Sequence, residues 1–173
     1  MHSTTSDTSA FTRAWPRRVL GLGLLILALT GCGREDSTLL AEINAREGTA
    51  YLQAHARQAG VIVRPSGLQV EILKAGDGPA PMPGDHVRVN YRGTLVDGRV
   101  FDDTWQRGEP AELAVDHLVP GFREGLGHVH TGGRVRLVIP AELAYGARGI
   151  PGVIGPNATL IFDVELLEIL PRS

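Results

Sequence analysis

Residues 87–103, VRVNYRGTLVDGRVFDD, hold the pattern that decides the fold. Val87, Val89 and Tyr91 alternate with polar residues, which is the period of a strand with one buried face. The dipeptide Asp97-Gly98 follows, and it favours a tight hairpin turn because glycine reaches positive φ without strain. The stretch therefore predicts a hairpin of an antiparallel sheet with one face on a core.

The same two-residue period recurs on both sides of this hairpin. It covers residues 68–72, 135–139 and 160–166. One segment between these runs has the pattern of a short helix: Pro120 lies in its first turn, and Phe122 and Leu126 are four residues apart. We therefore expect an α+β domain in which an antiparallel sheet packs against one short helix.

The composition is that of an ordinary globular protein, with 43% hydrophobic and 21% charged residues. The single cysteine excludes an internal disulfide and a thiolate metal cluster. The formal net charge of −2 becomes −4 once residues 1–31 are removed, which leaves 14 basic and 18 acidic residues. This acidic balance argues against nucleic acid or an anionic lipid surface as a partner.

The first 31 residues have the layout of a secretory signal peptide. Three arginines precede an uncharged aliphatic run, residues 19–31, which is shorter than the roughly 20 residues that a membrane-spanning helix needs. The run ends in LTGC at residues 29–32, which resembles the lipobox of bacterial lipoproteins and implies cleavage before Cys32 and acylation of its thiol. Gly33 follows where an aspartate would imply retention in the inner membrane, so the resemblance favours the periplasmic face of the outer membrane. A plain signal peptide with a chance cysteine is the alternative.

Residues 32–66 differ in character from the rest, and we expect them to form a partly helical spacer. Apolar residues recur at roughly helical spacing: Leu39, Leu40, Ile43, Ala50, Tyr51 and Ala54. Glu47 and Gly48 interrupt this stripe, and Gly60 is a suitable C-terminal stop for the helix. The pattern indicates a solvated helix with one apolar side, and a short dimerising coiled coil is the alternative.

The aromatic residues of the second half are Tyr91, Phe101, Trp105, Phe122, Tyr145 and Phe162. Four of them fall on the expected inner face, where a hydrophobic core is the simplest interpretation. The hydroxyls of Tyr91 and Tyr145 need partners, so part of this cluster should border a solvated cavity. Asp102 lies beside Phe101 and needs a cation or a donor, and Arg107 is close enough in sequence to supply one.

Residues 145–156, YGARGIPGVIGP, predict a long surface loop. Glycine recurs at every third position, but the run is far too short for collagen. It is not a phosphate-binding loop either, because such a loop is followed by a helix and none is predicted here. The apolar tips of the loop are Ile150, Val153 and Ile154. Exposed apolar side chains on a loop indicate contact with a ligand.

Together these stretches resemble the FKBP family of peptidyl-prolyl cis-trans isomerases, the macrolide-binding immunophilins. The motifs are VNYRGTL at 89–95, DG at 97–98, FD at 101–102, VPGF at 119–122, LVIP at 137–140, LAYG at 143–146 and LIFDVEL at 160–166. The resemblance assigns residues 67–173 to the isomerase domain and implies a bent antiparallel sheet wrapped around one short helix. Residues 47–69 are similar to the bacterial macrophage-infectivity-potentiator subgroup, whose longer dimerisation region is largely missing here.

The resemblance also implies a proline-binding pocket. Its catalytic residues would be Tyr91, Phe101, Asp102, Tyr145 and Phe162, and its substrate-binding residues would be Arg107, Leu113, Leu118, Val119, Phe122 and Ile154. In this assignment Phe122 forms the floor, Arg107 pairs with Asp102, and the Tyr145 hydroxyl and the Ile154 backbone N–H donate hydrogen bonds to the substrate. Three residues differ from the usual pattern of the family. Phe122 replaces the tryptophan that is most common there, Ala111 lies where an aromatic residue can occur, and Ile150 lies where a histidine often forms the tip of the loop. These differences alter the site at which macrolides would bind.

Such a pocket needs no nucleophile, general base, cofactor or metal. The planar X–Pro bond separates charge that its twisted transition state has largely lost, so an apolar pocket disfavours the ground state more. No motif of a catalytic triad is present, and His128 and His130 form an H-x-H without an evident third ligand, so we expect no metal.

The leading hypothesis is a lipid-anchored isomerase that acts on X–Pro segments of exported polypeptides as they fold. Two other classes stay open: a non-catalytic module that holds chains in the same groove, and a purely structural lipoprotein.

Overall fold

The computed structural model describes residues 32–171. The predicted signal peptide (residues 1–31) and residues 172–173 lie outside the described part, as does the side chain of Cys32. From Gly33 onward the chain forms one compact unit. Among the described residues, no helix combines the length and the apolar character needed to cross a membrane.

The described chain contains three α-helices, two short 3-10 helices and seven strands. In chain order they are α1 (Cys32–His55), β1 (Val61–Val63), β2 (Gln69–Lys74), β3 (His86–Leu95), β4 (Val100–Asp103), α2 (Thr104–Arg107), β5 (Ala111–Ala114), η1 (Val115–His117), α3 (Pro120–Leu126), β6 (Arg134–Ile139), η2 (Ala141–Leu143) and β7 (Leu160–Leu170).

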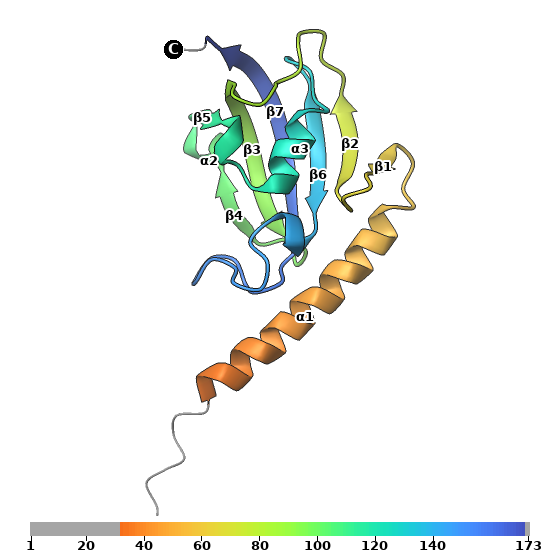
Figure 1. Ribbon diagram of the computed structural model, residues 1–173, viewed down its shortest axis with the longest axis vertical. Coiled ribbons are helices and arrows are strands. Elements are labelled where there is room, and N and C mark those ends of the chain that lie inside the picture. Colours follow the sequence, from red (N-terminus) through yellow and green to blue (C-terminus); the bar gives the residue numbers. More distant parts are fainter. Residues whose placement is uncertain (1–31, 172–173) are drawn as a thin grey trace, which may run out of the picture. The chain divides into compact units, whose positions relative to one another are not determined.

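The strands form a single antiparallel sheet in the order β1-β2-β6-β7-β3-β4, and β5 pairs with part of β3 (Figure 1). The predicted alternation is confirmed on β3, where Val87 and Val89 are fully buried while Arg88 and Asn90 are partly exposed. At the predicted hairpin Gly98 adopts φ +86°. The α+β fold class is therefore confirmed.

Helix α3 has the predicted bounds and lies across one face of the sheet (Figure 1). Pro120 begins it, and the helix buries Phe122 and Leu126. Gly125 lets the helix approach closely, since a Cβ at this position would lie 2.9 Å from Cγ of Leu137 on β6. The core between α3 and the sheet consists mainly of Val, Leu, Ile and Phe side chains.

Helix α1 is present as predicted, but it ends at His55 rather than near Gly60. The buried His55 side chain attaches this end of the helix to β2, because its Nδ1 lies 2.7 Å from Oε1 of Gln69. The chain must then turn to enter β1, which pairs with β2. Gly60 lies in that turn with φ +85°. β1 belongs to the sheet although it falls within the predicted spacer.

Much of the expected apolar stripe of α1 is exposed to solvent, in keeping with a solvated helix that has one apolar side. Leu39 is 58% exposed, and Leu40 and Ile43 are exposed as well. The buried residues of the described part of α1 are instead Gly48 and His55. Gly48 does not interrupt the contact face but allows it, because the smallest residue gives the closest approach.

Candidate active site

The register of three strands places the predicted site residues on one face of the sheet. Gly93 of β3 pairs with Asp102 of β4 and with Phe162 of β7. Tyr91 lies two residues from Gly93 on the same strand, and side chains two residues apart share a face. Tyr91, Asp102 and Phe162 therefore face α3.

A β-bulge brings two consecutive residues of β4 to this face. Asp102 pairs with Gly93 and Val100 with Thr94, so Phe101 is the extra residue between them. In a regular strand neighbouring side chains point to opposite faces, and a bulge changes the direction of one of them. Both Phe101 and Asp102 consequently contact groups of the same site.

Four aromatic rings meet there edge to face. Phe162 is central: its ring centroid lies 4.9 Å from that of Phe122, 5.5 Å from that of Phe101 and 6.0 Å from that of Tyr91. The rings of Tyr91 and Phe122 are 6.1 Å apart. Phe122 and Phe162 are buried, at 4% and 6% exposed, whereas Tyr91 and Phe101 are partly exposed. The cluster is thus buried on its inner side and open to solvent on its outer side.

Gly93 is a site residue that the sequence analysis did not single out. A Cβ at this position would lie 2.5 Å from Cζ of Phe101 and 2.9 Å from Cε1 of Phe162. The two rings therefore occupy the space that any side chain at residue 93 would take. Its signal in the sequence was a glycine in the interior of a strand, which marks a bulge or a close approach.

We expect Gly93→Ala to lower the free energy of unfolding by about 1–3 kcal/mol, because overpacking forces neighbouring rings from their positions. Urea denaturation measures this change. Gly127→Ala is the matched control, since Gly127 is exposed at the end of α3 with φ −65°, a conformation open to alanine. Equal effects of the two substitutions would contradict the packing argument.

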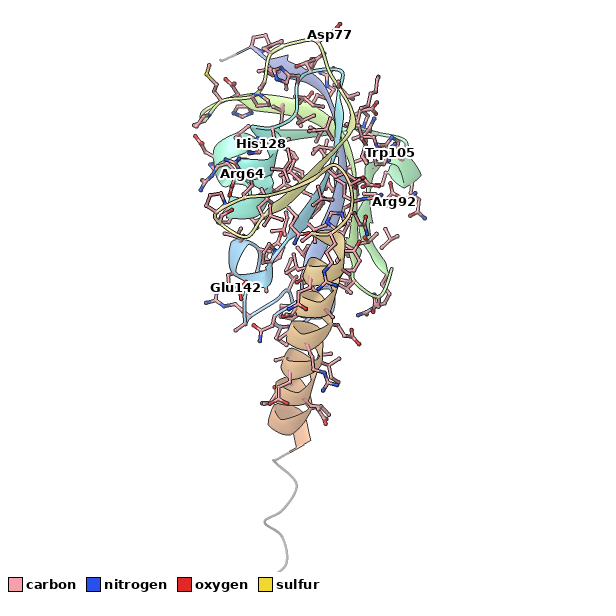
Figure 2. The ribbon with its side chains drawn as sticks, turned by 90° about the vertical axis from the view of Figure 1, so that its right-hand side faces the viewer. Arg64, Asp77, Arg92, Trp105, His128 and Glu142 are labelled. Carbon is pink, nitrogen blue, oxygen red and sulfur yellow. The ribbon has the colours of Figure 1, made fainter. Side chains whose placement is uncertain are left out.

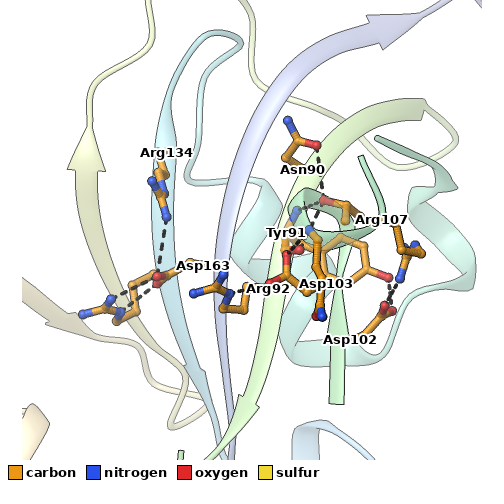
Figure 3. Close-up of polar contacts among 11 residues, drawn as sticks. Asn90, Tyr91, Arg92, Asp102, Asp103, Arg107, Arg134 and Asp163 are labelled. Carbon is orange, nitrogen blue, oxygen red and sulfur yellow. Dashed lines mark hydrogen bonds and ion pairs between the residues drawn. The ribbon is translucent and has the colours of Figure 1, made fainter. Parts of the chain in front are cut away.

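A polar network lies at the edge of the cluster (Figure 3). The Tyr91 hydroxyl donates a short hydrogen bond to one carboxylate oxygen of Asp102, and Arg107 forms an ion pair with the other. Helix α2 positions Arg107: Asp103 caps its first turn by accepting a hydrogen bond from the Gln106 N–H, and Gly108 ends it with φ +74°. This one-turn helix was not predicted from the sequence, although an aspartate before it and a glycine after it are capping signals.

The pKa shifts of the network follow from these contacts. Burial opposes ionisation of Asp102, but hydrogen bonds from Tyr91 and Arg107 outweigh it and hold the pKa of this carboxyl below its ordinary value of 3.8. Burial and the neighbouring Asp102 carboxylate raise the pKa of Tyr91. At neutral pH Asp102 is therefore charged and accepts, while Tyr91 is protonated and donates.

A lowered carboxyl pKa predicts that acid destabilises the protein through Asp102. The carboxylate contributes stability above its unfolded pKa, and that contribution is lost as the pH falls through the folded pKa. We expect Asp102→Asn to lower stability at neutral pH and to flatten the loss of stability between about pH 5 and pH 2. Urea denaturation across this range measures both effects. Asp116→Asn, at an exposed carboxylate of η1, is the control, and an acid profile of Asp102→Asn as steep as that of the control would refute the prediction.

The side chain of Asp103 lies on the opposite face of the sheet. Its carboxylate lies 2.6 Å from Nε of Arg92 (Figure 3). Arg136 binds Asp163 with two hydrogen bonds of 2.8 and 3.0 Å on the same face, since Asp163 pairs with both Arg92 and Arg136 in the sheet. Figure 2 shows Arg92 on the side of the sheet away from His128, which follows α3. Asp102 and Asp103 are neighbours in sequence, yet one faces the aromatic cluster and the other closes a network of surface charges.

The remaining predicted wall residues contact the hydrophobic core. Leu113, Leu118 and Val119 are partly exposed and pack against the same core as Tyr91 and Phe101. Ala111 also packs against this core, and its methyl group offers less apolar contact area than an aromatic ring at the same position would. The described part of the chain contains no group of three or more residues suited to bind a metal, and Nδ1 of His130 lies 2.8 Å from the carbonyl of Gly78.

Residues 145–157, which we call the rim loop, carry Tyr145. Its side chain is 38% exposed, and no hydrogen bond of its hydroxyl to another described residue is found. The backbone N–H of Ile154, which was predicted to donate to the substrate, donates to the carbonyl of Ile150 at 2.8 Å, and the Ile154 side chain is buried in the core. The apolar tips of the loop were expected to be exposed, but only Val153 is.

The comparisons with known proteins agree with this geometry. Residues 78–167 match the family described as FKBP-type peptidyl-prolyl cis-trans isomerase. FkpA of Escherichia coli strain K12 is 48% identical over 128 residues, which are 74% of this chain and 47% of that protein. The outer membrane protein MIP of Legionella longbeachae is 45% identical over 129 residues, 75% of this chain and 55% of that protein. The chain thus spans about half the length of these curated relatives.

Solved structures of peptidyl-prolyl cis-trans isomerases have the same fold as this chain. The crystal structure of FkpA from Escherichia coli superposes with a TM-score of 0.78 at 44% identity and covers 81% of this chain and 65% of that one. A peptidyl-prolyl cis-trans isomerase from Pseudomonas syringae superposes with a TM-score of 0.70 at 30% identity and covers 76% of this chain and 96% of that one.

Proposed function

Because the chain belongs to the family of FKBP-type peptidyl-prolyl cis-trans isomerases, we propose that it accelerates rotation about X–Pro peptide bonds. The observation that carries the proposal is the half-open cluster of Tyr91, Phe101, Phe122 and Phe162. A pyrrolidine ring on this cluster would be removed from water on an apolar surface. The Arg107 guanidinium, which Asp102 holds at the edge of the cluster, would bind the polar backbone beside the proline.

The apolar surface supplies the catalytic effect. Resonance opposes rotation with a barrier of about 18–20 kcal/mol, and uncatalysed X–Pro bonds isomerise over tens to hundreds of seconds. The planar bond carries separated charge on its oxygen and nitrogen, and the twisted transition state has largely lost this charge. Transfer from water to the aromatic cluster therefore raises the ground state more than the transition state, and the barrier falls.

Hydrogen bonds at the edge would hold the substrate in its twisted form. The exposed Tyr145 hydroxyl is one donor to a substrate carbonyl. The backbone N–H of Val119, which has no hydrogen bond to another described residue, replaces Ile154 as the second. Val119 is partly exposed and packs on the same core as Phe122. Asp102 acts indirectly, because its bond to the Tyr91 hydroxyl fixes the ring that forms one wall.

The deciding experiment is the cis-to-trans relaxation of a short X–Pro peptide with the purified protein. We expect acceleration proportional to protein concentration, and inhibition by a macrolide that occupies the same surface. Binding of the peptide without acceleration would refute isomerase activity and favour a module that only holds chains.

We extend the proposal to the place of action. The protein would be exported, cleaved before Cys32 and anchored by acyl chains on that cysteine. The spacer (residues 32–66) would then hold the isomerase domain (residues 67–173) at the membrane surface, where exported polypeptides fold. The lipobox-like sequence supports this, as does the similarity to a protein named for the outer membrane. Mass spectrometry of the mature N-terminus tests it, and an unmodified Cys32 would refute the anchor.

A further inference from the structure

Helix α1 contacts the rim loop directly. The side-chain Nδ2 of Asn44 donates a hydrogen bond of 2.8 Å to the carbonyl of Pro156, across 112 residues of sequence. Asn44 is partly buried, whereas its neighbours Ile43 and Ala45 are exposed. Proline has no N–H, so its carbonyl is the hydrogen-bonding group that Pro156 offers to the helix.

Two glycines make this contact close. A Cβ at Gly155 of the rim loop would lie 2.6 Å from Nδ2 of Asn44. A Cβ at Gly48, one turn further along α1, would collide with the hydroxyl of Thr159 and lie 3.1 Å from its Cβ. Thr159 is buried immediately before β7. The absence of side chains on both partners therefore lets the helix lie directly on the loop and on the start of the strand.

The contact is connected to Tyr145 through the base of the loop. Asn157, which follows Pro156, donates its backbone N–H to the carbonyl of Gly146 at 2.9 Å. Gly146 follows Tyr145 and donates to the carbonyl of Ala141 at 2.8 Å. Asn157 has φ +55°, a conformation that residues with a side chain adopt at a cost and keep when their surroundings hold them. The exposed Tyr145 side chain thus depends on the loop backbone for its position.

We propose that Asn44 is a positioning residue for the isomerase reaction: through Pro156 and the loop base, helix α1 sets the location of the Tyr145 hydroxyl at the edge of the aromatic cluster. The inference rests on the proposed function and adds to it that the spacer helix is part of the active unit. It assigns a role in catalysis to a residue far in sequence from all those predicted to bind substrate.

The test compares Asn44→Ala with Gln53→Ala in the full chain. Both substitutions remove a side-chain amide from α1, but Gln53 is exposed, and it is the Asn44 amide that is hydrogen-bonded to the loop. We expect kcat/KM for an X–Pro peptide to fall about threefold to tenfold in Asn44→Ala, the loss that follows from one hydrogen bond. Gln53→Ala should match the unaltered protein.

A double-mutant cycle separates positioning from a general loss of structure. If Asn44 acts through Tyr145, Asn44→Ala should have little further effect in a Tyr145→Phe protein, because the hydroxyl it positions is gone. Additive losses would overturn the proposal, and so would an Asn44→Ala protein with the activity of Gln53→Ala.

Amide hydrogen exchange gives a readout that does not need activity. The N–H groups of Ile150 and Ile154 are bonded within the loop, at 2.7 and 2.8 Å. They should exchange faster in Asn44→Ala, and also in Gly48→Leu, which keeps the Asn44 amide but pushes the helix from Thr159 and so separates that amide from the loop. Unchanged exchange in both variants would overturn the proposal. If the unaltered protein does not accelerate isomerisation, the proposed function fails, and exchange still decides whether α1 holds the loop.

Discussion

Replacing Phe101 with alanine is expected to lower kcat/KM for X–Pro isomerisation about 30- to 100-fold. The ring is partly exposed, packs edge to face on Phe162 at 5.5 Å, and forms one wall of the aromatic cluster. Removing it takes roughly 100 Å² of apolar contact from a bound proline, which is about 2–3 kcal/mol of transition-state binding. Peptide relaxation kinetics measure the loss.

Two further substitutions make this result specific. Phe101→Leu keeps an apolar wall and should retain more activity than Phe101→Ala, because the effect depends on apolar area rather than on a reacting group. Val100→Ala changes the exposed neighbour on the same strand and should leave the rate unaltered. A Phe101→Ala protein that folds and keeps full activity would contradict the proposed pocket.

Leu137→Ala is expected to lower the free energy of unfolding by about 3–5 kcal/mol, the upper range for a buried leucine. Leu137 is fully buried on β6, and its side chain lies against Gly125 of α3. Because a helix on one side and the sheet on the other enclose this position, the cavity left by the substitution cannot collapse. Urea denaturation monitored by circular dichroism measures the change.

The matched control is Ile72→Ala, at an exposed position of β2. It deletes a similar apolar side chain at the surface, and we expect a loss below about 1 kcal/mol. A Leu137→Ala protein no less stable than Ile72→Ala would show that the packing of α3 on β6 contributes little to folding.

Much of the site could be predicted because short-range patterns encode it. The alternation around Tyr91, the dipeptide Asp97-Gly98 and the Pro120 helix start each depend on local backbone preferences, and the structure has all three features. The expected pairing of Asp102 with Arg107 is present as well, since five residues separate them. The roles of these residues in catalysis stay proposals.

Other features of the site depend on contacts that form only in the folded chain. The N–H of Ile154 donates to the carbonyl of Ile150 because the loop turns back on itself between these two residues. The apolar stripe of α1 indicated a solvated helix and did not show which of its residues would contact the domain. The helix lies on the domain through Gly48, where Thr159, 111 residues away in the sequence, leaves no room for a Cβ.

The amino-acid pattern by itself determined strands β2, β3, β6 and β7, helix α3 and the face of the sheet on which the aromatic rings lie, because periodicity and turn chemistry act over a few residues. The tertiary structure alone decided the bulge that turns both Phe101 and Asp102 inward, the need for glycine at residue 93, and the contact of α1 with the rim loop. These features arise where segments far apart in the chain meet, and the available space there depends on atoms that no local pattern specifies.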